Sequence, residues 1–219
     1  MFKNRILLLT IILIIGLLFL LNKLVIVENY TNTTSKKQLN FKKTLEDMAT
    51  ILKKNKIPFH LHSGTALGAI REQRFIPHDN DIDIAIFNKD KVKNLDKLIL
   101  KENIFSLVYK LPLNSKYSDI MEMSFLHKQT NVKIDIFFIL EEKDKYKIFS
   151  YFGICDTKPN KRCEYVNSKY KLNDILFFNK NYKVPEIKFL EEQYGKDWKI
   201  SKKISYEEAL VSNGYKNMI

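Results

Sequence analysis

The spacing of apolar residues changes several times in the first part of the chain, and each spacing predicts a different element. Residues 6–27 are apolar almost throughout. Over residues 38–56 apolar side chains recur at helical spacing between Lys and Glu residues, and Pro58 follows, so we predict an amphipathic helix of about four turns. Residues 59–87 begin as a strand, continue as an Ala- and Leu-containing segment and end in an alternating run. This stretch predicts strand, short helix, loop and second strand.

The rest of the chain predicts more strands than helices. We predict, in order, an amphipathic helix from its N-cap Asp90 to Asn103, strands over 105–109, 120–127 and 132–140, a hairpin or extended segment over 175–184, and a helix over 186–194 closed by Gly195. Residues 141–174 are charged, and we expect irregular structure there. A chain of 219 residues is long enough for one domain with a full core, preceded by a tail.

The apolar run at residues 6–27 has the length of a membrane span. It comprises 22 residues, close to the roughly 20 that cross a bilayer as a helix. No small-residue cleavage site follows, so we predict an uncleaved signal anchor between a short cytosolic end at residues 1–5 and a polar, Thr-rich stem at residues 28–37. Positive charges on both sides leave the orientation open. The glycosylation sequons at Asn29 and Asn32 favour a lumenal body.

The charge of the chain indicates which partners it would attract. The net charge is +12, from 37 Lys and Arg against 25 Asp and Glu. Such a surface attracts anionic partners, including nucleotides, phosphorylated glycans and lipid head groups, or is simply a solvated, Lys-rich surface. The body is assigned to residues 38–200, and residues 201–219 form a polar tail. Cys155 and Cys163 predict a disulfide in a lumenal compartment, or a pair of free thiols if the body is cytosolic.

Three carboxylates stand at alternate positions where the second strand of the 59–87 stretch begins. Side chains alternate across a strand, so Asp79, Asp81 and Asp83 are expected on one side. These carboxylates repel one another unless a cation lies between them, and hard divalent cations such as Mg²⁺ take oxygen ligands of this kind. A calcium loop of the EF-hand type does not fit, because Ile84 stands where that loop needs Gly and Asp90 where it needs Glu.

Two further features suit phosphoryl transfer. A helix that begins just after Gly64 and Thr65 would offer free backbone N–H groups to a phosphate, although a plain helix-capping turn is the alternative. Asp135 interrupts an otherwise apolar strand, where a lone carboxylate needs a partner, either a metal or a nearby Lys or Arg. Together with the three acids, these residues predict metal-assisted phosphoryl or nucleotidyl transfer, in which Asp135 completes a metal shell or accepts the acceptor's proton.

Two aromatic pairs have simpler explanations than a site. His60 and His62 could bind a transition metal, but no third ligand is evident, and core or surface histidines are the favoured interpretation. Tyr194 and Trp198 stand four residues apart and are expected to be core packing rather than a sugar platform.

The motifs together resemble the LicD/fukutin family of phosphotransferases. Residues 64–71 and 75–84 are similar to the family signature GTLLGAxR followed by FIPWDxDxDI, and residues 184–198 resemble the family's closing element. The resemblance covers roughly residues 41–200. The sequence departs from the pattern at His78, which replaces a Trp, and at Ser63, where the family often has Gly or Asp. Both departures could reshape an acceptor pocket.

The resemblance implies a fold and an activity. The fold is a nucleotidyltransferase-like α/β (α+β) domain with a mixed sheet flanked by helices, here preceded by one transmembrane helix. The activity is the Mg²⁺-dependent transfer, with Mn²⁺ as the alternative cation, of a phosphorylated alcohol such as ribitol phosphate or phosphocholine from a CDP-linked donor to a glycan. The implied site comprises Asp81 and Asp83 as main metal ligands, Asp79 as an additional acid, Asp135 as the third-strand carboxylate, Gly64 and Thr65 as the phosphate contact, and Arg71 in phosphate pairing or structural support.

Two other functions stay open at this point. A Golgi glycosyltransferase with a D-x-D motif would share the anchor, the metal and a nucleotide donor, but few residues precede Asp79 for its nucleotide-binding half. An inactive scaffold with the same fold is the second alternative, against which the intact Asp81, Asp83 and Asp135 argue. We expect a Golgi or ER membrane protein with a lumenal catalytic domain and no nucleic-acid partner; a bacterial or viral membrane origin is the alternative.

Overall fold

The computed structural model describes residues 2–90, 93–112, 120–150, 163–202 and 217–218, with the backbone alone in parts of the first helix and at some strand ends. The chain divides into two units, Met1–Leu39 and Asn40–Ile219. Helix α1 (Phe2–Lys54) runs through the predicted stem and contributes to both units. The amphipathic helix predicted over residues 38–56 is confirmed by the C-terminal part of α1, which ends at Lys54.

The predicted membrane anchor coincides with the first part of α1. Most side chains of residues 6–27 lie outside the described residues. Among the residues that are described, none of the helices carries an apolar segment long enough to cross a membrane.

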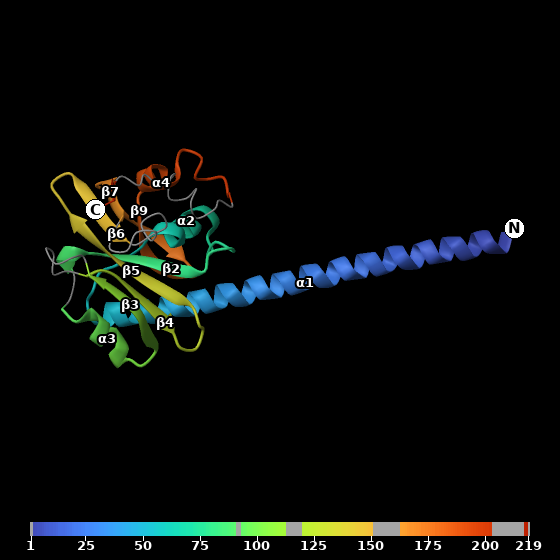
Figure 1. Cartoon of the computed structure of the whole chain (residues 1–219), viewed down its shortest axis with the longest axis horizontal. Coiled ribbons are helices and arrows are strands. Elements are labelled where there is room, and N and C mark those ends of the chain that lie inside the picture. Colours follow the sequence, from blue (N-terminus) through green and yellow to red (C-terminus); the bar gives the residue numbers. More distant parts are fainter. Residues whose placement is uncertain (1, 91–92, 113–119, 151–162, 203–216, 219) are drawn as a thin grey trace. The chain divides into compact units, whose positions relative to one another are not determined.

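The second unit is built on a mixed sheet (Figure 1). Its strands, as described, are β1 (His60–Leu61), β2 (Asp81–Phe87), β3 (Phe105–Pro112), β4 (Ile120–His127), β5 (Lys133–Glu141), β6 (Lys145–Ser150), β7 (Cys163–Ser168) and β10 (Asn217–Met218). The order β1-β2-β5-β6-β7-β10 forms the main path, and β4 pairs with β5 and also with β3. Strands β2 and β5 are parallel, whereas the other pairs are antiparallel.

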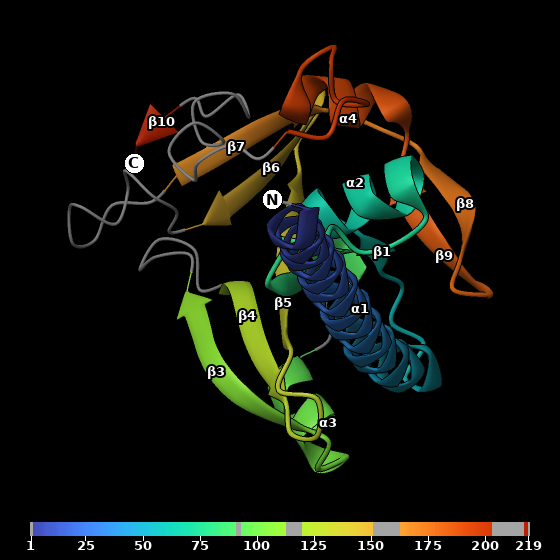
Figure 2. The same ribbon diagram turned by 90° about the vertical axis from the view of Figure 1, so that its right-hand side faces the viewer.

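Central strands β2 and β5 bury one face completely. Ile82, Ile84 and Ile86 of β2 are fully buried, as their alternation with polar residues predicts. They pack with apolar residues of the C-terminal part of α1 and with Leu95 and Ile99 of α3 (Leu95–Lys101). Figure 2 shows α3 beside the β3–β4 pair.

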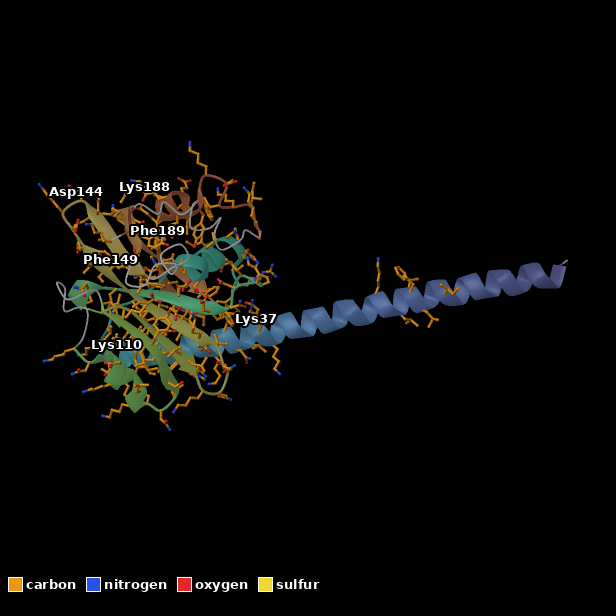
Figure 3. The ribbon with its side chains drawn as sticks, viewed as in Figure 1. Lys37, Lys110, Asp144, Phe149, Lys188 and Phe189 are labelled. Carbon is orange, nitrogen blue, oxygen red and sulfur yellow. The ribbon has the colours of Figure 1, made fainter. Side chains whose placement is uncertain are left out.

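The opposite face of the same strands is divided into an apolar part and a polar part. The apolar part contains Ala85, Phe137 and Ile139, which pack with Leu67 of α2 (Ser63–Glu72) and Phe189 of α4 (Ile187–Tyr194). Helix α4 is amphipathic, since Lys188 is exposed and the neighbouring Phe189 is buried (Figure 3). The polar part begins where the apolar part ends, at the first residues of β2 and β5.

Most predicted elements are confirmed. Residues 59–87 form β1, α2, a loop and β2. The strands predicted at 105–109, 120–127 and 132–140 correspond to β3, β4 and β5, and the helix predicted at 186–194 corresponds to α4, after which Gly195 has a φ of 82°. The hairpin predicted at 175–184 is formed by β8 (Leu172–Phe177) and β9 (Lys180–Pro185). Its two turn residues, Phe178 and Asn179, both have positive φ, as a tight hairpin of type I′ requires.

Two predictions of secondary structure are wrong. Asp90 is not the N-cap of the following helix: it ends a 3₁₀ turn, η1 (Asn88–Asp90), and α3 begins only at Leu95 after its N-cap Asn94. The described part of the charged segment 141–174 is not irregular, because β6, β7 and the start of β8 lie within it, whereas residues 151–162 lie outside the described residues. In β6 the apolar residues Ile148 and Phe149 are buried while Lys145 is exposed, so abundant lysine concealed a half-buried strand.

Candidate functional site

The polar part of the sheet is created by the register between β2 and β5. Asp83 pairs with Asp135, and Asp81 pairs with Lys133. Paired residues on neighbouring strands share a face of the sheet, so these four side chains lie together, opposite the buried isoleucines. Tertiary structure thus brings the predicted third-strand acid next to the D-x-D motif, from a strand that begins 50 residues later in the chain.

Lys133 neutralises two of these carboxylates. Its ammonium lies 3.1 Å from Asp81 Oδ2 and 3.1 Å from Asp135 Oδ2. Burial lowers the pKa of Lys133, but the carboxylates of Asp135 and Asp81 more than compensate and raise it. The predicted partner of Asp135 is therefore a lysine. Sequence analysis did not single out Lys133, although it stands two residues before Asp135 and hence on the same face of the strand.

Asp83 lies near four other carboxylates. Burial raises its pKa, and the negative charges of Asp81, Asp79, Asp135 and Glu122 raise it further. Burial also raises the pKa of Asp135, against hydrogen bonds from Ser124 and Lys133 that lower it. Four other acids therefore act on one buried carboxyl group, a concentration of charge that attracts cations.

The start of α2 lies against these acids. Asp79 precedes β2, and a Cβ atom added to Gly64 would lie 2.4 Å from Asp79 Oδ2, so only glycine lets the carboxylate approach the helix this closely. The buried hydroxyl of Thr65 accepts a hydrogen bond of 2.9 Å from the backbone N–H of Asp83. Gly64 and Thr65 therefore fix the helix start to the D-x-D strand. The residue before the helix, His62, provides no side-chain cap.

Arg71 contacts protein groups at the other end of α2. Its Nε donates to Glu72 Oε1 at 3.1 Å, and its Nη1 donates to the carbonyl oxygen of Trp198 at 3.1 Å. These contacts correspond to the structural-support role considered for Arg71. Trp198 is buried in the apolar cluster and Tyr194 packs against that cluster, so the core-packing interpretation of this pair is confirmed.

The fit of this site to a divalent cation depends on the arrangement of its side chains and on their ligand atoms. In the part of the chain that the structure describes, no group of three or more His, Cys, Asp or Glu side chains is arranged as a metal centre. The donors themselves, however, are the carboxylate oxygens that Mg²⁺ prefers, and the Lys133 ammonium shows that a cation is accommodated between Asp81 and Asp135. The chemistry of the donor set therefore fits a hard cation, and the metal stays a prediction.

Strands β3 and β4 add three polar residues that sequence analysis missed. Ser124 pairs with Asp135 and donates a hydrogen bond of 2.5 Å to its Oδ1. Glu122 stands two residues earlier on the same face and is almost fully buried, and the Tyr109 hydroxyl donates to its Oε1 at 2.5 Å. Neither strand shows these residues in a motif, so only the pairing of the strands could reveal them.

The histidine pair is part of the core, as favoured. His60 and His62 are buried, with their rings 5.7 Å apart, and His60 Nε2 lies 3.2 Å from the Tyr170 hydroxyl. Burial lowers the pKa of His60 and lowers that of His62 to about 3, so both imidazoles are neutral. For the predicted disulfide, Cys155 and the side chain of Cys163 lie outside the described residues.

Comparison with known proteins identifies similar chains. Residues 56–187 match the family described as LicD/FKTN/FKRP, nucleotidyltransferase domain. The chain is 31% identical over 179 residues to ribitol-5-phosphate transferase FKTN of Macaca fascicularis, covering 79% of this chain and 37% of that protein. It is 34% identical over 161 residues to the protein of that name from Mus musculus, covering 73% and 33%.

Other similarities extend to bacteria and to solved structures. An uncharacterized protein of Rickettsia typhi is 32% identical over 146 residues, which cover 67% of this chain and 42% of that protein. The chain thus spans less than half the length of these curated relatives. The lincomycin-bound crystal structure of the lincosamide antibiotic adenylyltransferase LnuA matches with a TM-score of 0.41 and 14% identity, over 66% of this chain and 79% of that one.

Proposed function

Because the chain belongs to the LicD/FKTN/FKRP family of nucleotidyltransferase domains, we propose that it is a phosphotransferase that moves a phosphorylated alcohol from a CDP-linked donor to a glycan. The single observation that carries this proposal is the alignment of Asp83 with Asp135 across β2 and β5, beside the start of α2. Relatives named as ribitol-5-phosphate transferases make ribitol phosphate the first candidate group, and phosphocholine is the second.

In this proposal Asp81 and Asp83 would hold a Mg²⁺ or Mn²⁺ ion, with Asp79 and Asp135 as further carboxylates. Such an ion would supply positive charge for the phosphate groups of the donor. The backbone N–H groups at Gly64 and Thr65 face the donor phosphates in this proposal, because a helix N-terminus is a favourable position for an anion.

The proposed reaction is an in-line displacement at phosphorus. A hydroxyl oxygen of the acceptor forms a bond to the phosphorus atom that carries the alcohol, and the bridging bond from this phosphorus to the oxygen of CMP breaks. The acceptor's proton goes to Asp135. Burial raises the pKa of this carboxyl group, which makes it a better proton acceptor than an exposed aspartate.

Membrane anchoring and location are part of the proposal and rest on the sequence. Residues 6–27 would anchor the chain, with the catalytic domain in the lumen of the Golgi or ER. Treatment of the full-length protein from a eukaryotic host with an N-glycosidase tests this topology. A mobility shift that disappears in the double variant Asn29→Gln/Asn32→Gln supports a lumenal body, and the absence of any shift combined with protease access from the cytosolic side contradicts it.

The activity is tested by CMP release. Full-length protein is incubated with CDP-ribitol, CDP-glycerol or CDP-choline in the presence of Mg²⁺ or EDTA, and wild type is compared with Asp83→Asn. We expect release from one donor, its loss in EDTA, and a decrease of at least about 100-fold in the variant. Asp83→Asn should fold normally because it removes a buried, repelled charge.

A matched control separates the site from general effects of Asp→Asn substitutions. Asp174→Asn changes an exposed aspartate of β8 and should keep wild-type activity. Turnover of UDP- or GDP-sugars in place of the CDP-linked donors would instead support a D-x-D glycosyltransferase. A folded protein that cleaves no donor, with or without glycan acceptors, would support the inactive scaffold.

A further inference from the structure

A line of polar side chains continues from Asp135 to β3, the outermost described strand on that side of the sheet. Ser124 of β4 pairs with Asp135, and Tyr109 of β3 pairs with Ser124. Asp83 pairs with Asp135 from the other side. Because paired residues share a face, Tyr109 lies on the acid-bearing face, two strands away from Asp135.

A β-bulge is what places Tyr109 on this face. Leu107 pairs with Phe125, but the register then shifts so that Tyr109 pairs with Ser124. In a regular antiparallel ladder Tyr109 would instead pair with Met123, whose side chain is buried in the core on the opposite face. The extra residue, Val108, therefore turns the Tyr109 ring away from the core. Bulges that redirect a side chain are frequent next to active sites.

The Tyr109 hydroxyl is held in place by a buried carboxylate. It donates a hydrogen bond of 2.5 Å to Glu122 Oε1. Glu122 is 1% exposed and lies close enough to Asp83 to repel its charge. A buried carboxylate near other carboxylates is unfavourable for folding, so its presence here favours a role in function over one in stability. Tyr109 itself is only half-buried.

We propose that Tyr109 is the contact for the acceptor, and that Glu122 is a positioning residue that fixes its hydroxyl. This inference rests on the proposed function and assigns its acceptor side. In an in-line displacement the acceptor enters opposite the leaving group. The donor phosphates are assigned to the start of α2, so the acceptor hydroxyl lies over Asp135 and the rest of the acceptor extends towards β4 and β3. An aromatic ring with an oriented hydroxyl suits the C–H face and hydroxyls of a sugar or polyol.

The first test measures binding without turnover. Saturation-transfer NMR is recorded with full-length protein and ribitol, methyl β-galactoside or methyl β-N-acetylgalactosaminide as probes. At least one probe should bind to wild type, and its signal should fall by about 10-fold in Tyr109→Ala. Leu176→Ala, at an exposed apolar residue of β8, is the matched control and should bind as wild type does. Equal binding by wild type and Tyr109→Ala, or binding by neither, overturns the proposal.

The second test separates acceptor binding from donor binding. For the probe that accelerates CMP release, Tyr109→Ala should raise the acceptor KM by at least about 10-fold while the donor KM changes by less than about 2-fold. Tyr109→Phe and Glu122→Ala should have smaller, similar effects, and Glu122→Gln, which keeps an oxygen for the Tyr109 hydroxyl, should restore a KM near that of wild type. A parallel rise of both KM values overturns the proposal. Probe binding that depends on Tyr109 in a protein that cleaves no CDP-linked donor contradicts the proposed function but keeps the sugar subsite.

Discussion

Two groups of titratable side chains arise from residues 59–87, and the surrounding structure treats them in opposite ways. Asp81 forms a salt bridge with Lys133, which also holds Asp135, the strand partner of Asp83. The imidazoles of His60 and His62 lie among aromatic rings instead. His60 contacts the rings of Phe87 and Tyr170, and His62 contacts those of Phe137 and Phe189.

The difference shows what decides the charge of a buried group. Among the residues that the structure describes, neither histidine has a carboxylate as hydrogen-bond partner. Burial lowers both pKa values, so the pair is neutral and functions as core. The acids have a lysine within reach, and the polar part of the sheet therefore keeps charged groups. A side chain that can titrate indicates a site only when its neighbours leave it a charge or a proton to transfer.

Replacing Lys133 should have the largest effect on stability. Lys133→Met removes the ammonium between Asp81 and Asp135, so these carboxylates repel each other and Asp83 without compensation. We expect a loss of about 2–3 kcal/mol in the free energy of unfolding, measured with urea, because one half-exposed partner of a pair is removed. The variant should also gain more thermal stability from Mg²⁺ than wild type does.

The control for Lys133 is a lysine of a surface pair. Lys183→Met breaks a salt bridge to the exposed Asp174 and should cost no more than about 1 kcal/mol. If Lys133→Met is no more costly than Lys183→Met, the acids do not depend on the lysine. The contrast with the histidine pair then fails.

The histidines should be detected through the pH dependence of stability. The pKa of His62 is lowered from an ordinary value of 6.5 to about 3, so between these values the unfolded chain binds a proton that the folded chain does not. Stability contributed by neutral His62 is therefore present above pH 6.5 and is lost as the pH falls. His62→Leu should flatten the slope of unfolding free energy between pH 5 and 6 by up to about 1.4 kcal/mol per pH unit.

The exposed His78 provides the control for this measurement, since His78→Leu should keep the slope of wild type. The acids act in the opposite sense: the raised pKa of Asp83 makes stability fall as the pH rises above 3.8, the ordinary value of this group. An unchanged slope in His62→Leu would mean that the imidazole is protonated in the folded protein and has a partner for its charge.

The smallest effect is expected at Gly64. In Gly64→Ala the new methyl group would meet the carboxylate of Asp79, which must move away from the start of α2. We expect a loss of about 1 kcal/mol in urea unfolding and a several-fold slower CMP release. Gly16→Ala is the control for the substitution itself, because nothing lies within 4 Å of its new methyl group, and it should leave urea unfolding of the domain and CMP release unchanged. Wild-type behaviour of both variants would show that Asp79 does not need the glycine.

Local patterns were sufficient for the elements that are strongly periodic. The alternation of aspartate and isoleucine predicted which face of β2 is buried, and Pro58 and Gly195 marked helix ends. Local patterns failed in segments where lysines occupy positions at which a strand usually has apolar or β-branched residues. Strands β6 and β7 lie in a segment that composition alone described as irregular. The N-cap was placed at Asp90 because its residue type is favourable, yet the chain first forms a 3₁₀ turn there.

The kinds of groups in the candidate site, and the strand that carries most of them, follow from the local sequence, because a strand's two-residue period orders the side chains of a D-x-D motif without help from the rest of the chain. The partners of these groups depend on how distant strands pair. The pairing of β2 with β5 brings Asp135 and Lys133 to the motif, and a bulge in β3 turns Tyr109 towards it. The register between strands that are distant in the chain is set when each strand buries its apolar face in the folded domain. The pattern within one strand does not encode which residue of the other strand it pairs with.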